Sequence, residues 1–332
     1  MKKIKIALVG ATGLVGRTAI EVLKEKNLPI SEYTFFASSK SAGSKIEFLN
    51  KEYIVQELNE HSFDKGFDYA IFCAGGEVSK KYAPLAASKG VIVIDNSSAF
   101  RMDKDVPLVV PEVNPEDLEW NNGIIANPNC STIQAVVALK PLDDKYKIKR
   151  VIYSTYQAVS GAGQKGIEDL ENTRKGLEPK KFPYAINNNC LPHIDVFLDN
   201  GYTKEEMKMI EETKKILHHE DLKVTATTVR VPVLNSHSES INLEFAKDFN
   251  ITELKELLKN SPGIILEDDI TNNIYPLATN ANGTDNVYVG RIRRDDTVKY
   301  GINMWVVADN IRKGAASNAV QILEKLIQKD TK

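Results

Sequence analysis

Cys130 stands where a short apolar run meets the start of a helical pattern. The run is IIANPNCST, residues 124–132, and the helical pattern continues as STIQAVVALKPL. The N-terminus of a helix carries partial positive charge and unsatisfied N–H groups, which lower the pKa of a thiol and stabilise an oxyanion. The position of Cys130 therefore predicts a thiolate nucleophile that attacks a carbonyl carbon.

The other two cysteines lack this position. Cys73 lies inside the apolar segment AIFCAGG and Cys190 lies in NNNCLPH, so we interpret both as structural residues. The three cysteines are far apart and have no CxxC spacing, which fits a reducing compartment and predicts neither a disulfide framework nor a zinc site. We expect no bound metal.

A thiol nucleophile needs a partner that exchanges protons, and His237 is the candidate among five histidines. It lies in a polar loop at the end of the apolar run VRVPVLN, which also carries Arg230, a candidate for carboxylate recognition. Residues seven apart on an unbroken strand face opposite sides, so we expect the chain to bend after Pro232. The adjacent His218 and His219 are better explained as a solvated helix face than as metal ligands.

A glycine-rich turn, GATGLVG at residues 10–16, separates the first predicted strand from the first predicted helix. Glycine lets the backbone approach a pyrophosphate, and the N–H groups of the helix start receive its charge. The spacing is GxxGxxG rather than GxGxxG, and a tight turn needs glycine for structural reasons alone. The strand before it and the helix after it favour a dinucleotide-binding turn.

The end of the second predicted strand indicates which dinucleotide is bound. Proteins specific for NAD place Asp or Glu there, whereas the loop SSKSAG has no acid and offers Ser38, Ser39, Lys40 and Ser41. This composition favours NADP, although a simple solvated loop would also contain such a lysine. A thiolate nucleophile combined with NADP predicts aldehyde oxidation through a thioester, or the reverse reduction of an activated acyl group.

The alternation of elements predicts an α/β fold with two domains. Residues 1–129 contain short apolar runs between helical patterns, which is typical of a Rossmann-type, doubly wound parallel sheet. We expect strands at IKIALVG, YTFFAS, YAIFCAGG, VIVIDNSS, PLVVPEVN and GIIANPN. Residues 130–310 contain longer β-branched runs, which predict a second α+β domain with a mixed or antiparallel sheet and few covering helices. An amphipathic helix within 311–330 is expected to complete the first domain.

Composition excludes several classes of protein. The 332 residues are 42% hydrophobic and 27% charged with a net charge of −2, so no basic field attracts nucleic acid or anionic lipid. The apolar segment near the N-terminus is interrupted by Gly and Thr, which argues against a signal peptide or a membrane span. We therefore expect a cytoplasmic protein that acts on a small molecule.

The motifs resemble those of the aspartate-semialdehyde dehydrogenase family, in order and over nearly the whole chain. They are GATGLVG, SSKSAG, DNSSAFRM, NPNCST, QAVSGAG, VRVPV followed by SHSES, VGRIR, and MWVVADN followed by KGAA. The resemblance implies reductive dephosphorylation of aspartyl 4-phosphate by NADPH to aspartate 4-semialdehyde, on the route to lysine, threonine and methionine. It also implies a homodimer or homotetramer, built through the sheet of the second domain.

The resemblance also implies roles for individual residues. Cys130 would form the acyl-thioester beside Asn129, His237 would be the general acid/base, and Gln157 would orient the acyl group. The implied substrate-binding residues are Arg230 for the α-carboxylate, Glu212 for the ammonium, and Arg101 with Lys215 for the phosphate. The run EETKK leaves Glu211 and Lys214 open as alternatives to Glu212 and Lys215. The implied cofactor-binding residues are Gly10, Thr12, Gly13, Leu14, Val15, Ser38, Ser39, Lys40, Ser41, Ser160, Gly161, Pro192 and Asn310.

Three alternative functions fit the sequence less well. N-acetyl-γ-glutamyl-phosphate reductase shares the chemistry, but its cysteine typically follows Pro-Gly, and its substrate has no free ammonium. Glyceraldehyde-phosphate dehydrogenase is disfavoured because the motif SCTTN is missing. A non-catalytic NADP-binding regulator on the same fold would have no need for Cys130, Gln157 and His237 together.

Overall fold

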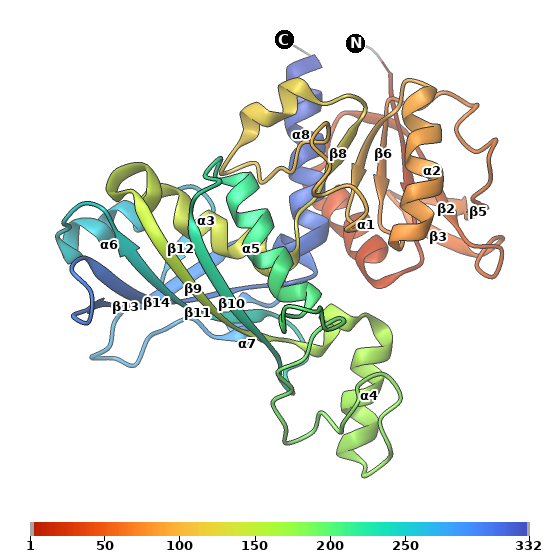
Figure 1. Ribbon diagram of the computed structural model, residues 1–332. Helices are drawn as coiled ribbons and strands as arrows, with labels where there is room; N and C mark the ends of the chain where they lie inside the picture. The colour runs from red at the N-terminus through yellow and green to blue at the C-terminus, as the bar shows by residue number, and fades with distance from the viewer. Residues whose placement is uncertain (1–2, 331–332) are drawn as a thin grey trace. The chain divides into compact units, whose positions relative to one another are not determined.

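The computed structural model describes residues 3–330, which form two compact units (Figure 1). The first unit consists of Met1–Pro128 and Ala315–Lys332, and the second of Asn129–Gly314. The chain therefore passes from one unit to the other between Pro128 and Asn129, one residue before Cys130, and returns immediately after Gly314. Within the described residues no helix is long and apolar enough to cross a membrane.

The first unit contains the predicted parallel sheet. Its strand order is β5-β2-β1-β6-β7-β8, and every pair of neighbours is parallel. The strands are β1 (Ile4–Val9), β2 (Ile30–Ala37), β5 (Gln56–Glu57), β6 (Tyr69–Phe72), β7 (Ile92–Asp95) and β8 (Ile124–Ala126). The order reverses between β1 and β6, and in open α/β sheets ligands bind outside the strand ends at such a switch point.

Helices cover both faces of this sheet, as a doubly wound fold requires. On one face α1 (Leu14–Lys26) and α8 (Ser317–Asp330) pack against β1 and share one apolar core with it, while α2 (Gly76–Ser88) packs on the other face. A short 3-10 helix, η1 (Pro115–Trp120), precedes β8. Because α8 supplies much of the first core, the C-terminal helix belongs to the first unit.

One sequence prediction for the first unit is wrong, and a hairpin was missed. The run PLVVPEVN is not a strand and makes only an isolated bridge from Leu108 to Ala126. Its two prolines cannot donate to a ladder, and the Asn114 side chain takes the backbone N–H of Val110 and the carbonyl of Leu108 instead. The hairpin of β3 (Lys45–Phe48) and β4 (Lys51–Ile54) was not predicted, because its alternation is weak and largely charged.

The second unit contains a mixed sheet with the order β10-β9-β11-β14-β13-β12. Only the β10/β9 and β12/β13 pairs are parallel. The strands are β9 (Ile148–Gln157), β10 (Lys223–Arg230), β11 (His237–Phe245), β12 (Ile264–Leu266), β13 (Val287–Asp295) and β14 (Gly301–Ala308). The five longer strands lie in the β-branched runs that predicted this sheet, whereas β12 has three residues and too little pattern to be recognised.

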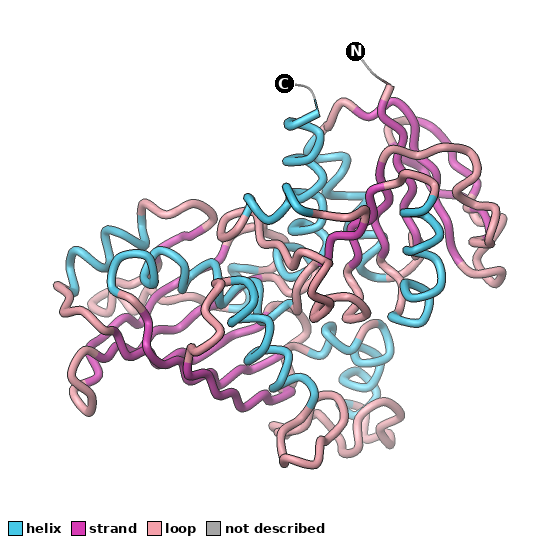
Figure 2. Tube along the Cα trace, turned by 45° about the horizontal axis from the view of Figure 1, so that its top comes forward, coloured by secondary structure: helices cyan, strands magenta, loops and turns pink. Residues whose placement is uncertain are grey.

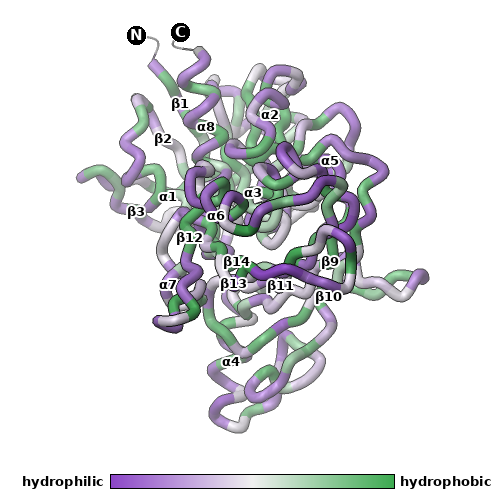
Figure 3. The backbone as a smooth tube through the Cα atoms, turned by 90° about the vertical axis from the view of Figure 1, so that its left-hand side faces the viewer, coloured by the Kyte–Doolittle hydropathy of each residue, from purple (hydrophilic) through white to green (hydrophobic). Residues whose placement is uncertain are grey.

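Three helices cover one face of the mixed sheet: α3 (Cys130–Tyr146), α5 (Lys204–Ile216) and α6 (Ile251–Lys259). Figure 3 shows α3 and α6 against the strands, and the tube in Figure 2 shows how the strands run side by side. The remaining elements are η2 (Val159–Ala162), α4 (Gln164–Arg174), α7 (Ala278–Ala281) and a π-helical turn, η3 (Arg312–Ala316). Both α3 and α5 begin close to the carboxyl ends of β9 and β10, where the candidate site lies.

Candidate active site

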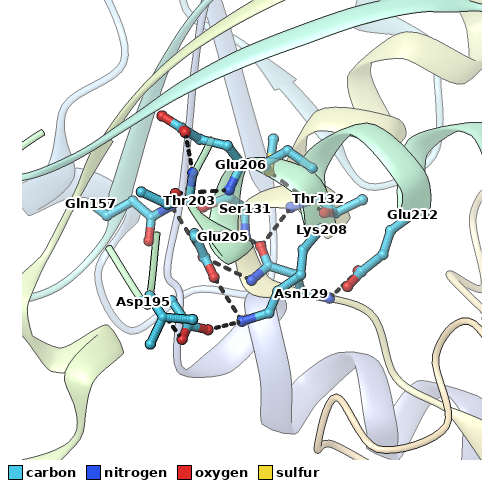
Figure 4. Close-up of polar contacts among 12 residues, drawn as sticks. Asn129, Ser131, Thr132, Gln157, Asp195, Thr203, Glu205, Glu206, Lys208 and Glu212 are labelled. Carbon is cyan, nitrogen blue, oxygen red and sulfur yellow. Dashed lines mark hydrogen bonds and ion pairs between the residues drawn. The ribbon is translucent and has the colours of Figure 1, made fainter. Parts of the chain in front are cut away.

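Cys130 is the first residue of α3, as the sequence predicted. Asn129 is the N-cap, and its Oδ1 accepts hydrogen bonds from the backbone N–H groups of Ser131 at 2.9 Å and Thr132 at 3.3 Å (Figure 4). Asparagine is among the best N-caps because its side chain satisfies donors that the helix leaves unpaired. These two N–H groups are therefore taken by the cap, so an oxyanion at Cys130 needs other donors as well as the helix dipole.

Helix α5 holds Asn129 from two sides. Glu212 Oε2 accepts the backbone N–H of Asn129 at 2.6 Å, and Glu205 Oε1 accepts its side-chain Nδ2–H at 2.9 Å. The two glutamates lie two turns apart on one face of α5, and both are buried. The residue before the nucleophile is thus fixed by two carboxylates.

This arrangement favours one of the two glutamates that the run EETKK left open. Glu212 is 1% exposed and contacts Asn129, whereas Glu211 is exposed. Lys214 lines a shallow depression with Arg150 and Lys223, at the opposite end of β10 from Arg230. The geometry therefore supports Glu212, rather than Glu211, as the glutamate that lies beside the start of α3.

Gln157 and Arg230 end two adjacent parallel strands. They are direct partners in the register of β9 and β10, so both side chains arise at the same edge of the sheet. Gln157 is 1% exposed, and its Nε2 donates to Thr155 Oγ1 and to Glu205 Oε1, both at 3.3 Å. Since an amide nitrogen has two hydrogens, these bonds use both and leave the carbonyl oxygen of Gln157 for a ligand.

Arg230 is 5% exposed and is incompletely paired. Its Nη1 donates to the Ala158 carbonyl at 2.6 Å, while its Nε has no hydrogen-bond partner within residues 3–330. Burial lowers the pKa of the guanidinium, and the charges of Glu205 and of the Cys130 thiolate oppose that shift. A buried guanidinium with an unpaired Nε–H suits a planar carboxylate, which an arginine can bind through two parallel hydrogen bonds.

The predicted bend after Pro232 is present and brings Arg230 and His237 together. Strand β10 ends at Arg230, the intervening residues are irregular with a positive φ of 71° at Ser236, and β11 begins at His237. A Cβ placed on Gly161 would lie 2.8 Å from Arg230 Nη1 and 3.2 Å from His237 Nε2. Both side chains therefore pack against the backbone of Gly161.

The ring of His237 is oriented by one backbone group. The residue is completely buried, and its Nδ1 accepts the N–H of Ala158 at 2.9 Å. Burial, and then the charge of Arg230, hold the pKa of His237 well below its usual value, so the ring is neutral. Because Nδ1 is an acceptor, the single ring proton is assigned to Nε2, which has no partner among residues 3–330. His237 is therefore set to donate a proton.

The space at Gly161 allows a direct test of this packing. In Gly161→Ala the new methyl group would overlap Arg230 Nη1 and press on the His237 ring, so both side chains must move. We expect kcat/KM to fall by about 100-fold, because a displacement of about 1 Å at a reacting centre costs that much. Steady-state kinetics would measure this fall in kcat/KM. Gly76→Ala is a suitable control, because a Cβ at Gly76 meets nothing within 4 Å. Gly163→Ala is unsuitable, because Gly163 has a positive φ that alanine would strain. An unchanged kcat/KM in Gly161→Ala would contradict this geometry.

Two predicted cofactor-binding residues of the second unit also meet. Asn310 Nδ2 donates to Ser160 Oγ at 3.0 Å, and both residues are buried. Asn310 Oδ1 accepts the N–H of Ser236 at 2.8 Å, which ties the bend before His237 to the end of β14. Pro192 is exposed and follows the bridge between Leu191 and Arg230.

The glycine-rich turn of the first unit fits a dinucleotide. A Cβ at Gly10 would lie 2.7 Å from the Cys73 carbonyl, and one at Gly16 would lie 2.1 Å from the Gly10 carbonyl, so both glycines are sterically required. Gly13 is the N-cap of α1 without a side-chain cap, and the first turn contains no acid. Thr12, Leu14 and Val15 are partly exposed beside it. An uncapped, acid-free helix start suits a pyrophosphate.

Other predicted residues of the first unit lie as follows. Ser38, Ser39 and Lys40 are exposed directly after β2, and Ser41 is partly exposed. Arg101 is 8% exposed and donates to the carbonyls of Asn127 and Asn96. Burial, with the nearby charge of Asp95, raises the pKa of Cys73 to about 12, so this thiol is protonated and unreactive at neutral pH.

Comparison with known proteins agrees with the resemblance. Residues 5–121 match the family model "Semialdehyde dehydrogenase, NAD binding domain", and residues 139–313 match "Semialdehyde dehydrogenase, dimerisation domain". The chain is 59% identical to aspartate-semialdehyde dehydrogenase of Aquifex aeolicus, with 98% of each chain covered. The chain belongs to the aspartate-semialdehyde dehydrogenase family. It is therefore an oxidoreductase that uses a nicotinamide cofactor and contains a dimerisation domain.

Further relatives and solved structures support the same family. The Campylobacter jejuni aspartate-semialdehyde dehydrogenase is 52% identical, again with 98% of each chain covered. The structure of aspartate semialdehyde dehydrogenase II from Vibrio cholerae complexed with ASA has a TM-score of 0.95 at 46% identity, and 99% of each chain is covered. The Candida albicans enzyme with NADP has a TM-score of 0.78 at 28% identity, and 98% of each chain is covered.

Sequence reasoning missed two participants in this site. Glu205 was not recognised, although it lies two turns before Glu212 on the same helix, which is a usable signal. The backbone of Ala158 was also missed: its carbonyl accepts Arg230 and its N–H donates to His237. No side-chain pattern reveals such a backbone role.

Proposed function

We propose that the chain interconverts 4-phospho-L-aspartate and L-aspartate 4-semialdehyde with NADPH and NADP, through a thioester on Cys130. The main support is the placement of Cys130 at the start of α3, fixed by Asn129, in the unit where Arg230, Gln157 and His237 also converge. The reaction belongs to the biosynthesis of lysine, threonine and methionine. A non-catalytic regulator would not need these four side chains in one unit.

The first half-reaction transfers the acyl group to the enzyme. The Cys130 sulfur attacks the acyl carbon, a C–S bond forms, the C–O bond to phosphate breaks, and inorganic phosphate leaves. The helix dipole at the start of α3 favours the thiolate, and Asn129 holds that start in place. His237 donates from Nε2 to the oxygen that develops negative charge, consistent with its neutral ring.

The second half-reaction releases the aldehyde. The nicotinamide cofactor, when bound, supplies the electron pair that reduces the thioester. The residues of the chain hold the reacting carbon: Gln157 orients the acyl group with its free carbonyl oxygen, and His237 remains the donor to the carbonyl oxygen. The C–S bond then breaks and the Cys130 thiolate is restored, ready for the next acyl group.

Charged residues match the charges of the substrate. The proposed assignments are Arg230 for the α-carboxylate, Glu212 for the ammonium, and Arg101 with Lys215 for the phosphate. Arg230 supports its assignment best, because its buried Nε is unpaired within residues 3–330. A zwitterion that carries a phosphate needs two cationic sites and one anionic site, which these four residues supply.

The two units are proposed to have separate tasks, with domain boundaries at 129/130 and 310/311, a few residues from the boundaries of the compact units. The NADP-binding domain is residues 1–129 completed by the helix in 311–330, with Gly10 to Val15 for the pyrophosphate and Ser38 to Ser41 for the 2′-phosphate. Residues 130–310 form the catalytic and dimerisation domain, in which Ser160, Gly161, Pro192 and Asn310 serve the nicotinamide. The face of the mixed sheet opposite α3, α5 and α6 presents Tyr156 and Trp305, beside Tyr275 and Leu277 of the segment before α7, and we propose that a homodimer or homotetramer forms there. A reducing cytoplasm would keep the Cys130 thiol from forming a disulfide.

An activity assay tests the proposed reaction. Purified protein is incubated with aspartate semialdehyde, NADP and phosphate, and formation of NADPH is followed by absorbance. Phosphate-dependent NADPH formation is expected, and N-acetylglutamate semialdehyde should give none, because Glu212 is proposed to bind a free ammonium. Turnover of the N-acetylated substrate alone would instead support the reductase alternative.

The loop after β2 predicts the cofactor preference. Ser38 and Lys40 are exposed there and no acid is present, so NADP should be preferred over NAD. Ser38→Asp combined with Lys40→Ala should reduce kcat/KM for NADP by roughly 10- to 100-fold, because the new carboxylate repels the 2′-phosphate. Activity with NAD should change little. Lys45→Ala on the neighbouring hairpin is the control, and equal use of both cofactors by the wild type would overturn this assignment.

A further inference from the structure

Glu239 is a buried carboxyl group that the proposed mechanism does not use. It lies on β11 two residues after His237, so both side chains point to the face of the mixed sheet that α3 covers. The residue is completely buried, and neither carboxyl oxygen has a hydrogen-bond partner within residues 3–330. Buried polar groups in native structures are nearly always paired, so an unpaired carboxyl group beside the active site needs an explanation.

The register of the sheet places Glu239 one row below the active site. Gln157 and Arg230 are direct partners at the ends of β9 and β10. Two residues earlier on β9, Thr155 is the partner of Glu239 on β11. Thr155 Oγ1 accepts a hydrogen bond from Gln157 Nε2 at 3.3 Å. Because partners across two strands lie on the same face, Glu239 belongs to the buried layer directly beneath the candidate site.

Gln134 of α3 reaches the same part of the sheet from the helix side. It lies about one helical turn after Cys130, so both side chains arise on the same face of α3. Its Nε2 donates to the carbonyl of His237 at 3.3 Å and to that of Val306, the partner of Glu239 on β14, at 3.5 Å. Gln134 therefore connects the helix that carries the nucleophile with the strand that carries the general acid.

The Gln134 amide can make these contacts in only one orientation. The two carbonyl oxygens require its NH₂ group, so the buried Oε1 is left over and has no partner within residues 3–330. An ionised carboxylate, which only accepts hydrogen bonds, could not satisfy Oε1. A protonated Glu239 has one O–H to donate, and a neutral carboxyl group is less costly to bury than a charged one. Burial accordingly raises the pKa of Glu239 well above its ordinary value.

We propose that Gln134 and Glu239 are positioning residues for the reaction of Cys130. The protonated Glu239 donates a hydrogen bond to Gln134 Oε1, and Gln134 holds the His237 strand at a fixed distance from α3. The inference rests on the function proposed above, and within it on the roles of Cys130 and His237. Neither positioning residue contacts substrate or cofactor in this assignment. Their effect is on the separation between nucleophile and proton donor, where a displacement of about 1 Å costs about 100-fold in rate.

The test replaces each positioning residue by methionine, which is similar in length and cannot form these hydrogen bonds. Gln134→Met is expected to lower kcat by about 10- to 100-fold through misplacement of the reacting groups. KM for aspartate semialdehyde should change little, because Arg230 is unaltered. Glu239→Met should show the same loss of kcat. Glu239→Gln should retain a kcat close to that of the wild type, because its NH₂ group can also donate to Oε1.

Tyr153→Phe is the matched control. Tyr153 is also completely buried on the helix-covered face of β9, where its hydroxyl pairs with Thr213 of α5 at 3.0 Å. Loss of that hydrogen bond should lower Tm while kcat per active site stays near that of the wild type. Alkylation of Cys130 counts the active sites and corrects each kcat for unfolded protein.

A double-mutant cycle and an infrared spectrum test the contact itself. If Glu239 acts through Gln134, the loss in Gln134→Met/Glu239→Met should be smaller than the product of the two separate losses by at least about threefold. The difference spectrum of wild type minus Glu239→Gln at neutral pH should contain the carbonyl stretching band of a protonated carboxylic acid. This band does not depend on activity, so it remains decisive if Glu239→Met does not fold.

The outcomes separate this inference from the proposed function. Wild-type kcat in Gln134→Met, multiplicative losses in the cycle, or equal losses in Glu239→Gln and Glu239→Met would overturn the positioning role and leave the proposed reaction intact. A difference spectrum without the carboxylic acid band would overturn the protonated form of Glu239, and the inference with it. If the wild type itself formed no NADPH from aspartate semialdehyde, the proposed function would be wrong instead.

Discussion

The Cys130→Ala variant is expected to lose turnover by on the order of 10⁴- to 10⁶-fold, as removal of a catalytic nucleophile does in other enzymes. The fold should be retained, because alanine is the best helix former and Cys130 is the first residue of α3, with Asn129 still able to cap it. Affinity for NADPH should be nearly unchanged. Steady-state kinetics, thermal melting and fluorescence titration with NADPH on one preparation would measure these three properties.

The matched control is Cys190→Ala, which removes an exposed cysteine outside the site. It should retain full turnover and should leave rapid alkylation of one thiol in place. Cys130→Ala should lose that rapid alkylation, since Cys73 is only partly exposed and desolvation raises the pKa of its thiol. Normal turnover by Cys130→Ala would falsify the thioester mechanism.

The Arg230→Lys variant is expected to lose substrate recognition while keeping a reactive thiol. A lysine carries the charge but not the two parallel donors, so the α-carboxylate would be bound poorly. Loss of a buried, charge-assisted pair costs on the order of 2–5 kcal/mol, which corresponds to roughly a thirtyfold to several-thousandfold fall in kcat/KM. Kinetics with aspartate semialdehyde and the alkylation rate of Cys130 would be measured together.

Arg150→Lys is a suitable control, because Arg150 lies on β9 of the same sheet and bonds Asn242 far from the site along the strand. It should affect Tm at most slightly and leave kcat/KM unchanged. The competing explanation is that Arg230 only supports the strand ends through the Ala158 carbonyl. In that case Arg230→Lys would melt early and still turn over normally at low temperature, and the carboxylate role would be withdrawn.

The sequence predicted those parts of the fold that depend on local patterns. The parallel sheet of the first unit and the five longer strands of the second follow from apolar runs of sufficient length. Strand β12 has too few residues to produce a pattern, and PLVVPEVN has the composition of a strand but prolines that prevent pairing. Hydrophobicity indicates burial more reliably than it indicates the hydrogen bonds of a ladder.

In the site as well, features that depend on neighbouring residues could be predicted, whereas contacts between distant residues could not. The helix-start position of Cys130 and the bend between Arg230 and His237 could be predicted, because each depends on a few consecutive residues. The contact of Glu205 with Asn129 spans 76 positions along the chain, and it depends on how α5 packs against α3. The tautomer of His237 depends on a backbone N–H of Ala158, a group that every residue except proline carries. Such contacts appear only in three dimensions.

In the proposed mechanism, Cys130 carries the acyl group of the substrate. Mass spectrometry of the enzyme mixed with aspartyl phosphate, without cofactor, and quenched in acid tests it most directly. The intact chain is expected to gain one aspartyl group within a single turnover time, the group should map to the peptide containing Cys130, and NADPH added before the quench should remove it. An acyl group on any other residue, or turnover with no acyl-enzyme formed at a competent rate, would show that Cys130 is not the acyl carrier.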